Sequence, residues 1–139
     1  MNIDSIYPEL FEYFGKISDI PRASYKEQEI ARYLCDFAEQ RGLEYYCDDA
    51  NNVLINLPAT EGCESVDAVL LQGHTDMVCE KRQGISHDFD TQGIKIYRDG
   101  DMLRAHGTTL GADDGVAVAS MLTITCLWSA LSILIIFLA

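Results

Sequence analysis

The 139-residue sequence has no run of basic residues, no closely paired cysteines and no charged residue from Gly115 to its last residue, Ala139. Ten Lys and Arg stand against 22 Asp and Glu, which gives a net charge of −12. Phosphates and anionic lipid surfaces are held by clustered positive charge, so this balance argues against nucleic acid and membrane surfaces as partners. The length fits one ordinary domain.

The five cysteines are widely and irregularly spaced, without a C-x-x-C pair. This pattern argues against a zinc–thiolate site and against a small disulfide scaffold. The N-terminal stretch Met1-Asn2-Ile3-Asp4-Ser5 has neither the positive region nor the apolar region of a secretory signal. Together, the odd cysteine count and the missing signal predict a reducing, cytoplasmic location.

Apolar residues recur at helical spacing over residues 7–17 and again over residues 30–38, predicting two helices. Ser24 and Glu27 match a capping box ahead of the second helix, and Gly42 stands where that helix would end. Short β signals cover residues 43–47, 53–57 and 67–72, and residues 94–98 and 102–105 predict a hairpin. The continuous apolar run within 67–72 suits a strand covered on both faces. The order of helices and strands predicts an α/β fold with packing helices.

The apolar run ends in Gly73-His74-Thr75-Asp76. The carboxyl end of a strand is where α/β sheets place ligands, and residues two apart on a strand project to the same side. We therefore expect His74 and Asp76 to point into one cleft, where imidazole is a good metal ligand and a carboxylate can orient it. A His and an Asp at this spacing more often form only a polar strand end, so the motif alone leaves both interpretations open.

A second motif places Asp113 and Asp114 between glycines, just before an apolar run over residues 116–122. If that run is a helix, both carboxylates lie at its positive end, which stabilises their charge. One interpretation is a helix N-cap in a glycine-rich turn. The other is metal ligation, because one carboxylate can bridge two cations.

Taken together, these motifs resemble the zinc-dependent aminoacyl-histidine dipeptidases, also called cytosol non-specific dipeptidases, of the co-catalytic metallopeptidase superfamily. The resembling stretches are Ile20-Pro21-Arg22-Ala23-Ser24, Leu71-Gln72-Gly73-His74-Thr75-Asp76-Met77-Val78, His87-Asp88-Phe89 and Gly107-Thr108-Thr109-Leu110-Gly111-Ala112-Asp113-Asp114-Gly115. They occur in the family's order and at about its spacing. The resemblance implies that residues 1–122 are the N-terminal part of a zinc-peptidase catalytic domain with a mixed sheet.

The resemblance also implies roles for individual residues. His74 would bind one zinc ion and Asp113 would bridge two, although manganese and cobalt also suit such ligands. Asp76 would belong to the catalytic machinery by lying behind His74 and tuning its basicity, and Asp114 would be structural at most. No further cofactor-binding residue is expected.

The family's reaction, as the resemblance implies it, is hydrolysis of dipeptides, both Xaa-His and others, by a water activated between two metals. The family's general base and remaining ligands lie downstream of the bridging Asp, but no acidic residue or His follows Asp114 here. We therefore expect a truncated domain that is inactive alone. Homo-oligomers remain open for full-length relatives. His87 and His106 are expected to have surface or packing roles.

Residues 123–139 depart from the family pattern and form an apolar tail. One explanation is a frameshift or premature truncation; another is a transmembrane helix, since an uncharged apolar stretch of more than about 18 residues can span a bilayer. No Lys or Arg flanks the tail, which favours the first explanation. Two other classes of function remain: a non-catalytic binding or interaction module with a vestigial metal site, and a membrane-anchored acidic domain.

Overall fold

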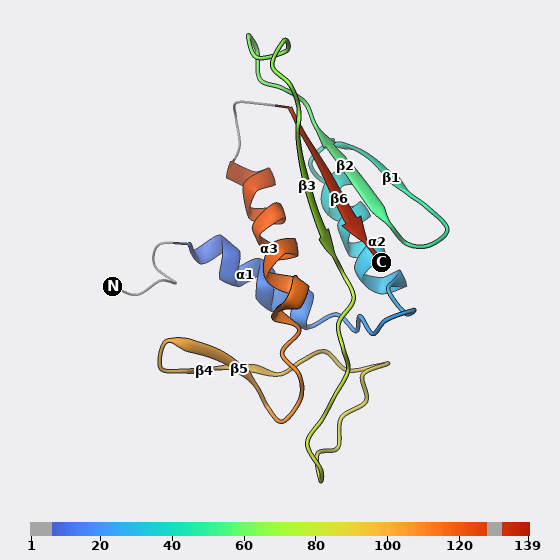
Figure 1. Cartoon of the computed structure of the whole chain (residues 1–139), viewed down its shortest axis with the longest axis vertical. Helices are drawn as coiled ribbons and strands as arrows, with labels where there is room; N and C mark the ends of the chain where they lie inside the picture. Colours follow the sequence, from blue (N-terminus) through green and yellow to red (C-terminus); the bar gives the residue numbers. More distant parts are fainter. Residues whose placement is uncertain (1–6, 128–131) are drawn as a thin grey trace.

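The computed structural model describes residues 7–127 and 132–139, in which helices pack on a four-stranded sheet (Figure 1). The strands run in the order β1-β2-β6-β3, from β1 (Glu44–Cys47), β2 (Val53–Leu57), β6 (Ile133–Leu138) and β3 (Val69–His74). Strand β2 is antiparallel to both β1 and β6, whereas β3 and β6 are parallel. The predicted α/β class with a mixed sheet is confirmed.

The helices are α1 (Pro8–Ser18), α2 (Gln28–Glu39) and α3 (Ala112–Leu127). Pro8 occupies the first turn of α1, where its missing N–H leaves no helical bond unmade. The hairpin of β4 (Ile96–Asp99) and β5 (Met102–Ala105) turns on the predicted Asp-Gly signal and forms a separate two-stranded sheet. In Figure 1 this hairpin lies beyond α1, away from the four-stranded sheet.

The predicted capping box does not form. Helix α2 begins only at Gln28, and Glu27 at its N-cap makes no side-chain capping bond. The Ser24 hydroxyl instead donates to the Asp76 carboxylate, while the Glu27 carboxylate accepts from the backbone N–H of Tyr25 at 2.6 Å. A hydrogen bond to a charged acceptor is stronger than a neutral capping bond, which explains why the hydroxyl is used there.

Strand β3 differs from its prediction in its bounds and in burial. It runs through His74 and lies at the edge of the sheet, rather than inside it, among the described strands. The predicted burial on both faces is wrong, because Leu70 is 58% exposed and Val69 is also exposed. Apolar content alone cannot distinguish an inner strand from an edge strand; only the neighbouring strands decide it.

The greatest difference from the sequence prediction concerns the apolar tail. Helix α3 continues to Leu127, and Ile133–Leu138 form β6, which lies between β2 and β3 in the sheet. The carbonyl of Leu138 accepts from Thr75 N at 2.7 Å, which ties the ends of β6 and β3 together. An uninterrupted run of branched apolar residues is typical of an inner strand. Residues 133–138 are therefore part of the α/β sheet. That residues 123–139 depart from the family's sequence pattern stays a prediction.

No helix in the described ranges is both long enough and apolar enough to cross a bilayer. Over residues 133–138 the chain is a strand, not a helix. The prediction that no secretory signal is present concerns Met1–Ser5, which lie outside the described residues, as do residues 128–131 of the tail.

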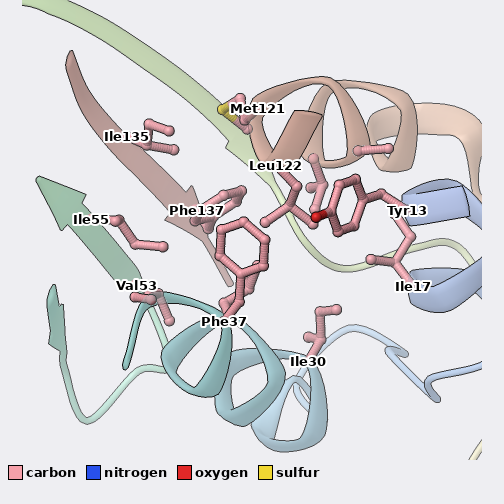
Figure 2. Close-up of a cluster of buried hydrophobic side chains, with 14 of the residues drawn as sticks. Tyr13, Ile17, Ile30, Phe37, Val53, Ile55, Met121, Leu122, Ile135 and Phe137 are labelled. Carbon is pink, nitrogen blue, oxygen red and sulfur yellow. The ribbon is translucent and has the colours of Figure 1, made fainter. Parts of the chain in front are cut away.

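The core fills the space between the helices and one face of the sheet (Figure 2). Alternate residues of β2 and β6 point into it and the intervening ones do not, as expected for strands with one covered face. Tyr13 and Phe37 meet edge to face, with ring centroids 5.7 Å apart. The labelled members are Tyr13, Ile17, Ile30, Phe37, Val53, Ile55, Met121, Leu122, Ile135 and Phe137.

Tyr13 makes the core sensitive to alkaline pH. Burial, together with contact with Cys126, raises the pKa of its phenol to about 12, from 10.0. The folded state therefore binds this proton more tightly than the unfolded state does. Its stabilising effect is complete below about pH 10 and is lost as pH rises towards 12, a loss on the order of 2 kcal/mol.

Tyr13→Phe removes the titrating group and keeps the ring against Phe37. We expect this variant to lose less free energy of unfolding than the wild type between pH 9 and about 12, as measured by urea denaturation at each pH. Tyr46→Phe, at an exposed tyrosine of β1, is the control and should retain the wild-type profile. Identical profiles for all three proteins would rule out a role for Tyr13.

Candidate metal-binding site

The carboxyl end of β3 presents His74 next to the start of α3. Gly73, one residue earlier, is buried against α3, and a Cβ there would lie 2.8 Å from Asp114 Oδ2 and 3.0 Å from Met121 Cε. The backbone N–H of His74 is directed at the same Asp114 oxygen, at 3.4 Å. The missing side chain at Gly73 thus lets the strand approach the helix closely enough to place His74 beside both aspartates.

His74 is held between two carboxylates. Its Nδ1 lies 2.9 Å from Asp76 Oδ1, and its Nε2 lies 3.2 Å from Asp113 Oδ1. Burial lowers the pKa of His74, but the hydrogen bonds to Asp76 and Asp113 and the charges of Asp76 and Asp114 outweigh it, so the net pKa is raised. The expectation that His74 and Asp76 share one side of the strand end is met, and Asp113 joins them from the other motif.

Asp113 and Asp114 lie in the first turn of α3, directly after Ala112, but neither has helical dihedral angles, and the peptide bond between them is cis. The Asp113 side chain is 97% exposed, so its carboxylate is open to solvent while facing His74. The two aspartates therefore have different surroundings: Asp113 faces outwards, and Asp114 faces the backbone of β3.

Arg22 fixes the loops around the site, a role that the sequence analysis did not assign. It is only 2% exposed. Its guanidinium donates to Thr75 O at 2.8 Å, to Gly111 O at 2.6 Å and, at 3.4 Å, to Asp76 O. One buried cation thereby joins the loop after β3 to the loop before α3.

Two further details support this arrangement of loops. Gly111 has a φ of +70°, and a Cβ there would lie 2.5 Å from Arg22 Nη2, so both the backbone angle and the space require glycine. Ser24 holds the Asp76 carboxylate from the opposite side to His74. Arg22 and Ser24 belong to a stretch that carried the family resemblance, and no other sequence signal placed them near this site.

The remaining histidines lie outside this cluster. The ring of His87 packs against Phe89, with centroids 4.5 Å apart, and that of His106 packs on Tyr97, with centroids 4.3 Å apart. These contacts agree with the packing roles expected of them.

The cluster fits part of a zinc site. Two ligand atoms bound to one tetrahedral zinc ion stand roughly 3.3 Å apart, close to the 3.2 Å between His74 Nε2 and Asp113 Oδ1. The carboxylate of Asp76 on the other ring nitrogen is the usual support of a metal-binding histidine. However, within residues 7–127 and 132–139 no group of three or more His, Cys, Asp or Glu side chains is arranged to hold a metal ion. The fit is to two ligands rather than to a complete site.

Comparison with known proteins matches the chain to dipeptidases. It is 43% identical over 115 residues to the cytosol non-specific dipeptidase of Escherichia coli (strain K12), a match over 83% of this chain and 24% of the relative. The crystal structure of aminoacylhistidine dipeptidase from Vibrio alginolyticus has a TM-score of 0.86 at 38% identity, covering 93% of this chain and 27% of that one. No protein-family model matches the chain.

A more distant likeness shows the fold alone. An aminopeptidase from Bacillus cereus has a TM-score of 0.76 at 23% identity, over 94% of this chain and 36% of that structure. The chain spans about a quarter of the length of the two dipeptidases that it matches. The two dipeptidases are named as hydrolases of peptides, so the hydrolase class implied by the resemblance is confirmed at the level of these relatives. The chain is thus a relative of the aminoacyl-histidine dipeptidases, matched over most of its own length and about a quarter of theirs.

Proposed function

We propose that this chain supplies one part of the metal-binding site of a dipeptidase. The observation that carries the proposal is the arrangement of His74 between Asp76 and Asp113, with the outer ring nitrogen and the Asp113 carboxylate spaced as two ligands of one ion. The names of the relatives support dipeptides as the substrate class, aminoacyl-histidine ones included. The name of the E. coli relative likewise supports a cytosolic location.

In this proposal His74 and Asp113 would hold the metal ion, and the exposed outer side of the Asp113 carboxylate would leave it accessible to a second ion. Asp76 would accept the Nδ1 proton of His74, which would leave Nε2, the nitrogen next to Asp113, as the one that binds the ion. Ser24 holds Asp76 in the orientation that this bond needs. Bound zinc, manganese or cobalt would supply Lewis acidity for peptide hydrolysis.

Metal titration tests the ligand set. In calorimetric titrations of the chain with Zn²⁺, we expect weak binding that His74→Ala or Asp113→Asn lowers at least about 10-fold, because each variant removes one of two protein donors. Asp76→Asn should weaken binding by about 10–100-fold by disturbing the ring that it orients. His106→Ala, a histidine outside the cluster, is the matched control and should bind like the wild type. Equal affinity for His74→Ala and wild type would refute the proposed site.

We expect hydrolytic activity only when further metal ligands and a general base, which the described residues do not supply, complete the site. With its two metal donors and no described third, the chain should show no metal-dependent hydrolysis of a dipeptide panel above background. The E. coli relative, assayed in parallel, is the positive control. Turnover that depends on added metal and disappears in Asp113→Asn would show that the chain is an enzyme by itself. Zinc binding without turnover matches the proposal and is also what a non-catalytic metal-binding module would give.

A further inference from the structure

A hollow that the candidate metal site does not use lies where the hairpin of β4 and β5 meets the loop after β3. Its volume is about 510 Å³, which is within the range of roughly 300–1,000 Å³ usual for small-molecule sites. Neither His74 nor the aspartates of the candidate metal site line it. Its polar lining includes Arg82, Arg104, His106 and Thr108.

The charge of this hollow is opposite to that of the chain. Arg82 and Arg104 are cations and His106 can become one, and no carboxylate is among the described residues that line the hollow. In the whole sequence, 22 Asp and Glu stand against 10 Lys and Arg, so carboxylates outnumber cationic side chains about two to one. The hollow is therefore a local concentration of positive charge, which attracts anions.

The two segments that carry these groups are joined through their backbones. Arg82 N donates to Gly107 O at 2.8 Å, and Lys81 and Thr108 form an antiparallel bridge. Gly107 has a φ of +79°, and a Cβ there would lie 2.7 Å from Ile85 Cγ1, so only glycine allows this close approach. The backbone of Arg82 is thereby fixed beside the end of the hairpin.

The hairpin presents its polar groups on one face. His106 N donates to Lys95 O at 3.0 Å, so the pairing continues one residue beyond β5, and side chains two apart project to the same side. Tyr97 is the cross-strand partner of Arg104, and its ring lies on that of His106, with centroids 4.3 Å apart. The Asp99 carboxylate accepts from Arg104 Nε at 2.6 Å. This ion pair uses one side of the guanidinium, and Nη1 has no hydrogen bond in the part of the chain that the structure describes.

Two other donors at the hollow also lack partners. Within residues 7–127 and 132–139, the Arg82 guanidinium makes no hydrogen bond or ion pair. The Thr108 hydroxyl is buried without a hydrogen-bond partner, which is unusual in folded proteins and calls for an explanation. An exposed arginine alone is ordinary surface chemistry. Two arginines, a histidine and an unused hydroxyl around one hollow are what an anion with several acceptor oxygens requires.

We propose that this hollow binds a phosphate group, either free or as a monoester, through Arg82 and Arg104 with His106 as a further donor. Guanidinium groups hold phosphate oxygens by paired, charge-assisted hydrogen bonds. A phosphate group has three acceptor oxygens and about 1.5 to 2 negative charges at pH 7. It therefore satisfies two arginines better than a carboxylate, which carries one charge.

The test follows the backbone amide signals of the whole chain by NMR during titration with sodium phosphate. The titration is done at pH 7 and constant ionic strength, without added metal ions. We expect saturable shifts centred on Gly107 and Thr108. Arg82→Gln and Arg104→Gln should each weaken binding at least about 10-fold, because each removes charge-assisted hydrogen bonds.

The controls separate specific binding from loss of structure and from general attraction of anions. Arg82 is exposed and unpaired among the described residues, so Arg82→Gln should keep the amide spectrum of the folded wild type. Arg32→Gln, at an exposed arginine of α2, should bind phosphate like the wild type. Phenyl phosphate is the second probe: tighter binding than that of inorganic phosphate assigns the hollow to monoesters, and weaker binding assigns it to free phosphate.

Three results would overturn the proposal. One is phosphate affinity in Arg82→Gln equal to that of the wild type. Another is sodium acetate causing the same shifts at the same concentrations, which would mean that the hollow attracts any anion. The third is a set of shifts spread over the chain or absent at residues 106–108, which would mean that phosphate does not bind at this hollow.

Discussion

Replacing Ile135 with alanine should lower the free energy of unfolding by about 2–5 kcal/mol, because its side chain is fully buried and the surrounding core cannot close the space. The same replacement at Ile136, the next residue of β6, should cost only roughly 1 kcal/mol, since that side chain lies on the other, partly exposed face of the sheet. The two variants remove the same atoms from adjacent positions of one strand. The difference between the two losses in free energy of unfolding therefore reports which face of β6 is buried, not which residues the strand contains.

The measurement is urea denaturation of the two variants and the wild type, with the m-value as a check that the folded states are comparable. Similar losses at Ile135 and Ile136 would mean that residues 133–138 are not an inner strand with one covered face. No effect at either position would mean that this segment lies outside the folded structure. Only the second outcome would restore the sequence-based view of an apolar tail separate from the domain.

Arg22→Met should be among the most destabilising single changes in this chain. It removes the donors for the carbonyls of Thr75, which is buried, and Gly111, which is partly buried, and leaving each without that partner costs about 1–3 kcal/mol. Burial lowers the pKa of Arg22, and the charge of Asp76 acts in the opposite direction. We expect a total loss of roughly 3–5 kcal/mol in the free energy of unfolding.

Two variants make this measurement interpretable. Arg32→Met removes an exposed arginine that pairs with Glu29 on the surface of α2, and it should change stability by no more than about 0.5 kcal/mol. Arg22→Lys keeps the charge but lacks the planar fork that reaches both loops, so it should recover only part of the loss. Full recovery with lysine would show that charge, rather than the geometry of the fork, holds the loops together.

Arg22 also shows why part of the site could not be predicted. The chemistry of the candidate site can be predicted from the sequence, because His74, Asp76 and Asp113 are residue types typical of metal sites. The two-residue period of a strand also places His74 and Asp76 on one side. No local sequence pattern indicates that Arg22, near the start of the chain, will be buried beneath two loops that come later in the sequence. That depends on β3 and α3 packing side by side, which brings residues 75 and 111 to the same guanidinium.

The Ser24–Glu27 pair shows the same limit in the fold. As a sequence it satisfies a capping rule, and in isolation the hydroxyl would accept the helical N–H. The structure offers a competing charged acceptor, Asp76, which the sequence places 52 residues away. Local rules fail at such points because the partner that wins comes from another part of the chain.

By itself, the sequence determined most of the helices and strands, since periodicity, prolines and glycines act over a few residues, and it identified the aspartates and the histidine of the candidate site. Three features could be known only from the tertiary structure: Ile133–Leu138, within the uncharged run, form a strand between β2 and β3; β3 is an edge strand; and His74 meets Asp113. Each depends on contacts between residues far apart in the chain. The free energy of such contacts comes from burial and pairing in three dimensions, and no local pattern of residues records it.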